Sequence, residues 1–243
     1  MTRKARFGGW ILYAAVLAPG SLYAQSPPAT NAPAELHLSI VSSLPGKHRA
    51  VPVVIWLEPL TGTPALSFPP HGHYTLLQKN RTFIPHLQVV PVGSIVEFPN
   101  RDPFFHNVFS LFGGKRFNLG LYEAGSSKSV RFSMAGVSYI FCNIHPEMSA
   151  VVIALNTPLF AVGDAKDSVL LRGIPSGDYK LHVWIEGVPQ SFLDGLSRPM
   201  HFSNHAVDLG VLKAPIADAG TIPHRNLYGQ EYPLDGHSPY SPY

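Results

Sequence analysis

The only cysteine of the 243-residue chain, Cys142, lies three residues before His145 and six residues before Met148. This spacing places a thiolate, an imidazole and a thioether on one short segment. Two imidazoles, one thiolate and a weak axial thioether are the ligands of blue copper electron-transfer sites. His106, directly after Phe104 and Phe105, is the candidate for the second imidazole. The sequence therefore predicts one type 1 copper ion held by His106, Cys142, His145 and Met148.

Each predicted ligand has a distinct role in one-electron chemistry. Soft thiolate and thioether ligands favour Cu(I), whereas imidazoles accept both oxidation states. Cys142 is expected to form the short covalent bond, and Met148 the long bond that tunes the potential. Because four ligands leave no open position, we expect no substrate reaction at the metal and no enzymatic activity. Asn107, beside His106, is expected to connect the two ligand segments by hydrogen bonds.

The segments on either side of Cys142 and Met148 have the pattern of β-strands. Residues 138–141 form an apolar stretch that leads into Cys142, and residues 149–155 form another that follows Met148. Pro146 stiffens the connection between them. A lone cysteine is more commonly an inert, buried apolar side chain, but these flanking strands favour a ligand loop.

The rest of the chain is predicted to be all-β. It contains 24 Pro and 21 Gly with only 14% charged residues, and no convincing amphipathic helix. Short apolar stretches recur between turn residues, which indicates a Greek-key β-sandwich followed by a small second β-sandwich. The predicted organisation is a signal peptide (1–24), a polar linker (25–34), the metal-binding domain (35–156), a second β domain (157–213) and an extended or disordered tail (214–243).

The first 24 residues have the features of a secretory signal. Arg3, Lys4 and Arg6 precede an apolar stretch, and a small residue, Ala24, offers a cleavage point. The apolar stretch is short, so no stable membrane insertion is expected. The sequence thus predicts a periplasmic or otherwise exported protein. A lone thiol in an oxidising compartment is a liability unless a metal occupies it.

The charge of the chain does not favour a nucleic-acid partner. The formal net charge of +3 equals the three basic residues of the predicted signal, so the remaining chain is close to neutral. The basic isoelectric point therefore gives no indication of a nucleic-acid partner.

The segment from Phe98 to Ser110, taken with the Cys142 loop, resembles the plastocyanin/azurin-like cupredoxins. The ligand spacing in the Cys142 loop is similar to that of amicyanin. The wider sequence pattern is similar to that of the exported "methylamine utilization protein" group of cupredoxin-like proteins. The resemblance covers residues 36–155 and implies an electron carrier that serves a redox partner such as a cytochrome or a dehydrogenase. Residues 173–179 resemble a carboxypeptidase-regulatory-like, transthyretin-like β-sandwich. Glu147 departs from the apolar docking surface that such carriers usually have around the loop histidine.

Two other functions are alternatives to an electron carrier: a copper enzyme, and a protein that stores or delivers copper or serves as an interaction module. His71 and His73 form a His-x-His pair of the kind found in multicopper oxidases, but Phe141 and Asn143 stand where those enzymes have histidines beside the cysteine. A nitrite-reductase-like enzyme would need a second, His-only copper site. A copper store, chaperone or interaction module is the second alternative, and of these a chaperone would need an exposed, exchangeable site.

Overall fold

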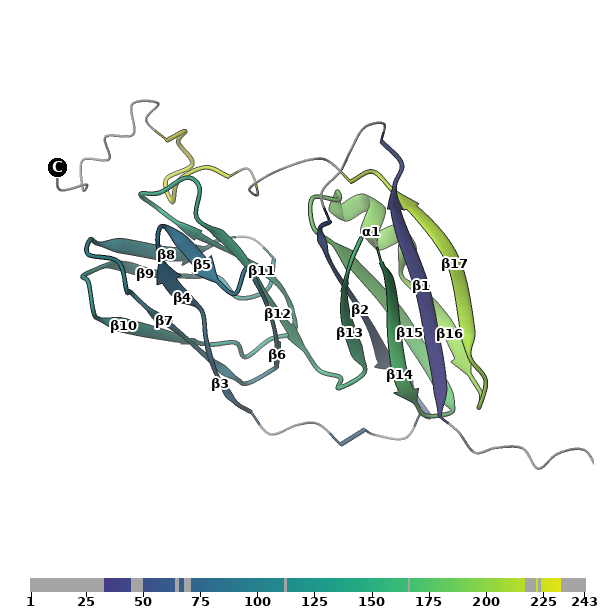
Figure 1. The fold of residues 1–243 in the computed structure, drawn as a ribbon. Helices are drawn as coiled ribbons and strands as arrows, with labels where there is room; N and C mark the ends of the chain where they lie inside the picture. The colour runs from purple at the N-terminus through teal and green to yellow at the C-terminus, as the bar shows by residue number, and fades with distance from the viewer. Residues whose placement is uncertain are drawn as a thin grey trace, which may run out of the picture. The chain divides into compact units, whose positions relative to one another are not determined.

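The computed structural model describes residues 33–44, 50–63, 66–67, 71–111, 113–165, 167–216, 222 and 224–232. The predicted signal peptide and most of the predicted linker lie outside these residues. The described residues form seventeen strands and one short helix in five sheets (Figure 1), which confirms the all-β prediction. Within this part of the chain, no helix has the length and hydropathy that a membrane crossing requires.

The first sandwich contains ten consecutive strands. They are β3 (His73–Thr75), β4 (Leu77–Lys79), β5 (Thr82–Ile84), β6 (Leu87–Pro91), β7 (Ile95–Pro99), β8 (His106–Ser110), β9 (Phe117–Tyr122), β10 (Ser127–Arg131), β11 (Gly136–Cys142) and β12 (Ser149–Leu155). One sheet has the order β6-β12-β11-β8-β9, a second has the order β10-β7-β3, and β4 pairs with β5 as a hairpin. The strand order is not sequential, so the chain crosses between the sheets as it does in Greek-key sandwiches.

The second sandwich combines the start of the described chain with its later part. Its elements are β1 (Ala34–Ser42), β2 (Pro52–Pro59), β13 (Phe160–Asp164), β14 (Ser168–Ile174), β15 (Gly177–Ile185), α1 (Gln190–Leu196), β16 (Arg198–Phe202) and β17 (Val207–Ala214). The sheets have the orders β14-β1-β17 and β13-β2-β15-β16.

The pairing of β1 and β2 differs from the predicted division of the chain at residue 156. The sequence predicts both strands to lie in the metal-binding domain, whereas the structure pairs Leu36 with Leu171 and Trp56 with His182. The physical reason is that an alternating apolar pattern identifies a strand but not its partner. The first sandwich is consequently inserted between β2 and β13 of the second.

Strand β12 contributes to two hydrophobic cores. All seven of its side chains are buried. Because successive side chains of a strand point to opposite faces, Val151 and Ile153 join the core that contains β1, β2 and β15, while Ala150 and Val152 join the core around Cys142. This double burial explains why the strand is apolar at nearly every position.

Candidate metal centre

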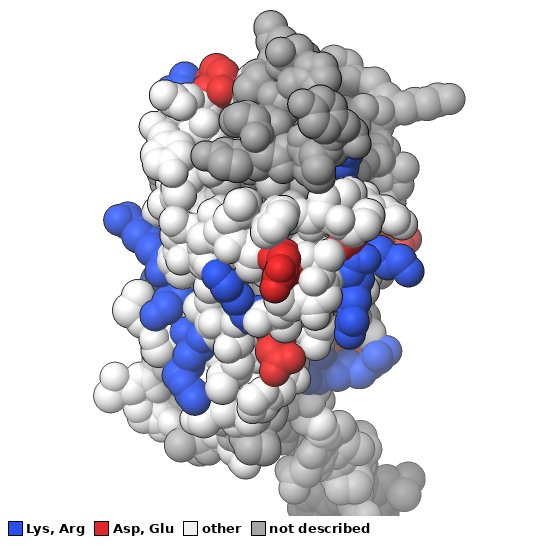
Figure 2. All heavy atoms as spheres, turned by 90° about the vertical axis from the view of Figure 1, so that its left-hand side faces the viewer, with Lys and Arg blue, Asp and Glu red and all other residues white. Residues whose placement is uncertain are grey.

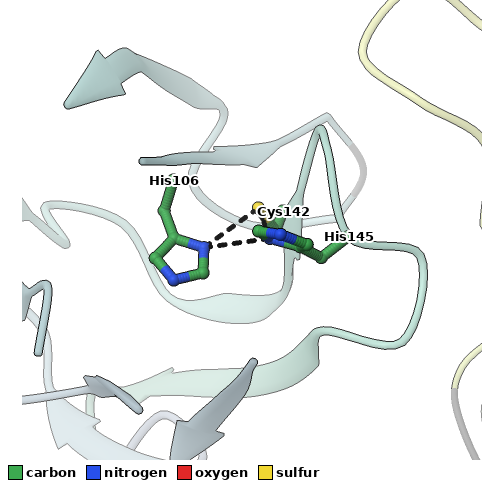
Figure 3. Close-up of side chains that lie close together, drawn as sticks. All are labelled: His106, Cys142 and His145. Carbon is green, nitrogen blue, oxygen red and sulfur yellow. Dashed lines mark hydrogen bonds between the residues drawn. The ribbon is translucent and has the colours of Figure 1, made fainter. Parts of the chain in front are cut away.

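The structure brings three of the four predicted ligands together. His106 Nδ1 lies 3.6 Å from Cys142 Sγ, His145 Nδ1 lies 3.5 Å from the same sulfur, and the two ring nitrogens are 3.1 Å apart. Figure 3 shows the two imidazoles and the thiol turned toward one another. All three side chains are buried. Among the described residues, these three are the ones whose potential metal-ligand atoms all lie within 4.8 Å of one another.

The dimensions of this triangle fit a bound metal ion. A first-row metal such as zinc binds imidazole nitrogen at about 2.0–2.1 Å and thiolate sulfur at about 2.3 Å. Donor atoms around such an ion therefore lie about 3.3–3.8 Å apart. The distances between the three donor atoms, from 3.1 to 3.6 Å, are close to this range. The two nitrogens and the sulfur are thus nearly preorganised for one ion.

Neighbouring strands bring His106 and Cys142 to the same place. His106 begins β8 and Cys142 ends β11, and these strands pair with Cys142 opposite Val108. The main chain of Asn107 connects the two ligand segments: its N–H faces the Cys142 sulfur, and its carbonyl accepts a 2.9 Å bond from Asn143 N. The predicted connecting role of Asn107 thus belongs to its backbone, because its buried side-chain Oδ1 has no hydrogen-bond partner.

Met148 closes the ligand loop. Its N–H donates to the carbonyl of His145 at 3.1 Å, and its own carbonyl accepts from Cys142 N at 3.3 Å. The side chain is fully buried in the same hydrophobic core as Cys142. The loop is therefore a tight connection between β11 and β12, and its fourth predicted ligand lies in the core that contains the cysteine.

Burial sets the protonation of the three donors in the metal-free protein. It raises the pKa of Cys142 to about 11, although backbone N–H groups facing the sulfur oppose the rise. Burial, together with repulsion from His106 in its protonated form and from Arg81, lowers the pKa of His145 to about 4. Burial also lowers the pKa of His106, against the opposing effect of Asp102. Both imidazoles are consequently neutral at pH 7, the form that binds a metal, and the metal must displace one thiol proton.

Asp102 fixes the orientation of the His106 ring, a role that the sequence analysis did not assign. His106 Nε2 lies 2.9 Å from Asp102 Oδ2, and both side chains are buried. An imidazole that donates its Nε2–H to a carboxylate presents the lone pair of Nδ1 to the metal. The only local signal is an acidic residue four positions before the ligand.

The Asp102 carboxylate also stabilises the turn between β4 and β5. It accepts hydrogen bonds from Asn80 N at 2.6 Å and Arg81 N at 3.0 Å. Both turn residues have positive φ, 54° and 52°, as a two-residue type I′ hairpin requires. Burial would raise the pKa of Asp102, but the N–H groups of Arg81 and Asn80 and the His106 ring together lower it. The carboxylate therefore stays ionised near neutral pH.

Phe104 covers the histidine side of the site. Its ring centroid lies 5.3 Å from that of His106 and 5.4 Å from that of His145. The guanidinium of Arg81 lies over the Phe104 ring, 5.3 Å from its centroid. This arrangement keeps water from the imidazoles and places one positive charge close to them.

The remaining histidines of interest lie apart from this site. His73, in the His-x-His pair, is exposed, and its Nδ1 lies 3.7 Å from a carboxylate oxygen of Glu97. His201 pairs with Asp178 at 2.8 Å. Both contacts are with carboxylates, which gives these histidines a role as surface ion pairs when protonated.

Comparisons with known proteins give fold likenesses only. The chain matches no protein-family model and no curated protein. Among solved structures it is similar to the Novel Purple Cupredoxin from Nitrosopumilus maritimus, with 24% identity over 35% of this chain and 99% of that chain, and a TM-score of 0.31. A copper-containing nitrite reductase from Thermus scotoductus is 26% identical over 42% of this chain and 26% of that chain, with a TM-score of 0.33. An oxidized mutant of amicyanin is 21% identical over 34% of this chain and 81% of that chain, with a TM-score of 0.32.

The geometry of the chain itself carries the assignment of the site. The ligands lie at the start of β8 and on the β11–β12 loop of one sheet. Two imidazoles and one thiol converge there, and Met148 is buried in the same core as Cys142. The first sandwich is thus a β-sandwich that contains the donor set of a type 1 copper site.

Proposed function

We propose that this chain is an exported type 1 copper protein that carries single electrons between redox partners. The observation that carries the proposal is the buried convergence of His106, Cys142 and His145, with donor atoms within 4.8 Å of one another. Copper, when bound, supplies a Cu(II)/Cu(I) couple. The protein holds the donors in nearly fixed positions, so that little rearrangement accompanies the change of oxidation state. Export is supported by the signal-like residues 1–24.

The closed surroundings of the site favour an electron carrier over a copper chaperone or an enzyme. His145, the most accessible of the three donors, is only 8% exposed, and His106 and Cys142 are fully buried. A chaperone must release its metal to a partner, which requires exposed ligands. An enzyme must admit a substrate to the metal. Electron transfer needs neither, because the electron crosses the protein matrix.

The charge of the first sandwich bears on its redox partner. Residues 71–156 contain seven Lys and Arg against four Asp and Glu. Figure 2 shows basic side chains outnumbering acidic ones on the face in view. Glu147, beside His145, is exposed and adds one negative charge near the ligand loop. A redox protein with a mainly acidic docking face, such as a cytochrome or a dehydrogenase, would be steered toward this surface.

Reconstitution with Cu(II) tests the proposed function directly. We expect one copper ion per chain, an intense visible thiolate-to-copper charge-transfer band and a type 1 paramagnetic-resonance spectrum. The band should disappear on reduction with ascorbate and return on reoxidation. Zinc-loaded protein is the matched control and should remain colourless, because Zn²⁺ has a filled d shell. A copper-loaded protein without the band would rule out the type 1 assignment.

Substitution of Met148 tests the predicted axial ligand. We expect Met148→Leu to bind copper and keep the charge-transfer band, but with a higher reduction potential, because loss of the thioether donor destabilises Cu(II). Met134→Leu is the matched control, since Met134 is 57% exposed. Voltammetry of both variants and the unchanged protein measures the effect. An unchanged potential in Met148→Leu would remove Met148 from the ligand set.

A further inference from the structure

A segment near the C-terminus contacts three consecutive residues at the start of the ligand loop. The ring of His224 stacks on Phe141, with centroids 4.0 Å apart and planes 15° from parallel. Tyr232 Oη donates a 2.8 Å hydrogen bond to the carbonyl of Cys142, and Leu227 N donates a 2.7 Å bond to Asn143 Oδ1. Figure 1 shows this segment in yellow beside the loop that joins β11 to β12. The sequence predicts only an extended or disordered tail here.

Residues 224–232, the capping segment, have a defined internal structure. Asn226 Oδ1 accepts hydrogen bonds from the N–H groups of Tyr228 and Gln230, both at 2.9 Å. Asn226 N donates to the carbonyl of Gln230, and Arg225 pairs with Glu231, again at 2.9 Å in each case. These bonds form a compact turn, so the contacts with the ligand loop are presented together rather than by independent side chains.

The capping segment and the His106 strand hold the same loop residue. Asn143 donates its backbone N–H to the carbonyl of Asn107 and accepts the bond from Leu227 through its side chain. Directly before it, Cys142 is held by Tyr232 at its carbonyl. The backbone that carries the sulfur is thus restrained from two directions.

We propose that Tyr232 is a positioning residue of the metal centre, through which the capping segment holds the backbone of Cys142 in the geometry that ligates the metal. For the metal-free protein this inference stands on the observed contacts alone. For the copper-loaded protein it also rests on the proposed function. A hydrogen bond to the Cys142 carbonyl withdraws electron density from the ligand residue, which stabilises the reduced site, and hydrogen bonding around a ligating cysteine is a known determinant of potential.

Alkylation of Cys142 in the metal-free protein tests the contact without copper. The thiol is fully buried, so iodoacetamide reacts only when the loop opens. Loss of one ordinary hydrogen bond raises the open population about fivefold, and we expect Tyr232→Phe to be alkylated faster by that factor. Tyr228→Phe makes the same chemical change in the same segment, where the side chain is 73% exposed, and should react at the unchanged rate. Equal rates in all three proteins would overturn the proposal.

A second variant and a second measurement separate positioning from general stability. His224→Ala removes the stacking on Phe141 and should raise the alkylation rate by a similar factor. With copper bound, Tyr232→Phe should show a lower potential and a shifted charge-transfer band, whereas Tyr228→Phe should show neither. A potential and band identical to those of the unchanged protein would refute the positioning role. Failure of the unchanged protein to form the band would instead refute the proposed function. The alkylation rates would still show whether the Tyr232 hydrogen bond restrains the loop that carries Cys142.

Discussion

Cys142→Ser should lose the visible charge-transfer band completely. The thiolate is the source of the transition, and a serine hydroxyl at the same position stays protonated and binds copper weakly. We expect copper affinity to fall more than 100-fold, beyond the 10- to 100-fold loss typical of residues that only support ligands. Absorption spectroscopy and competition with a chelator measure both effects.

The same variant should remain folded without metal. Cys142 is fully buried in an apolar core, so its replacement places a hydroxyl there at a cost of about 1–3 kcal/mol. Denaturant unfolding of the metal-free proteins measures this cost and serves as the control for the spectroscopic result. A folded Cys142→Ser protein that kept the band would contradict the whole assignment of the site.

Asp102→Asn should weaken both the metal centre and the fold. The amide cannot hold His106 in one tautomer as the carboxylate does, so we expect copper affinity to fall about 10- to 100-fold. The carboxylate also accepts the N–H groups of Asn80 and Arg81. Leaving one of these partners unsatisfied should lower the free energy of unfolding by about 1–3 kcal/mol. Glu123→Gln, at an exposed position of the same sandwich, is the matched control.

The pH dependence of stability gives Asp102→Asn a second signature. The folded state lowers the pKa of Asp102, so its carboxylate stabilises the fold above the unfolded pKa of about 4 and loses this effect as the pH falls through the folded value. The stability difference between Asp102→Asn and the unchanged metal-free protein should therefore shrink in acid. Urea unfolding at pH 7 and pH 3 tests this, and an equal difference at both would exclude the ionised carboxylate as the cause.

The candidate ligands could be selected from the sequence because three of them occupy one short loop. Cys142, His145 and Met148 follow each other at fixed spacing, and the strands on either side have clear apolar patterns. His106 was accessible to the same reasoning, because Phe104 and Phe105 directly precede it. Local chemistry and local secondary structure were enough to identify these residues.

The residues that support the ligands could not be predicted in this way. Asp102 looks like an ordinary turn residue between Arg101 and Pro103. Its importance arises from the hairpin turn at residues 80–81, which only the folded chain brings to it. Tyr232 lies ninety residues from Cys142 in sequence, and a polar, Pro-rich composition gives no indication of its partner. Contacts of this kind depend on tertiary structure.

The insertion of one sandwich into the other has a consequence for synthesis on the ribosome. Strands β1 and β2 emerge before β3–β12, while their partners β13, β14, β15 and β17 follow only from Phe160 onward. At about 5–20 residues per second, translation of the intervening stretch takes roughly 5–20 s. During that interval the apolar early strands lack their neighbours, and such unpaired edges aggregate readily. Nascent chains paused before Phe160 would therefore be the form of this protein that most needs a chaperone.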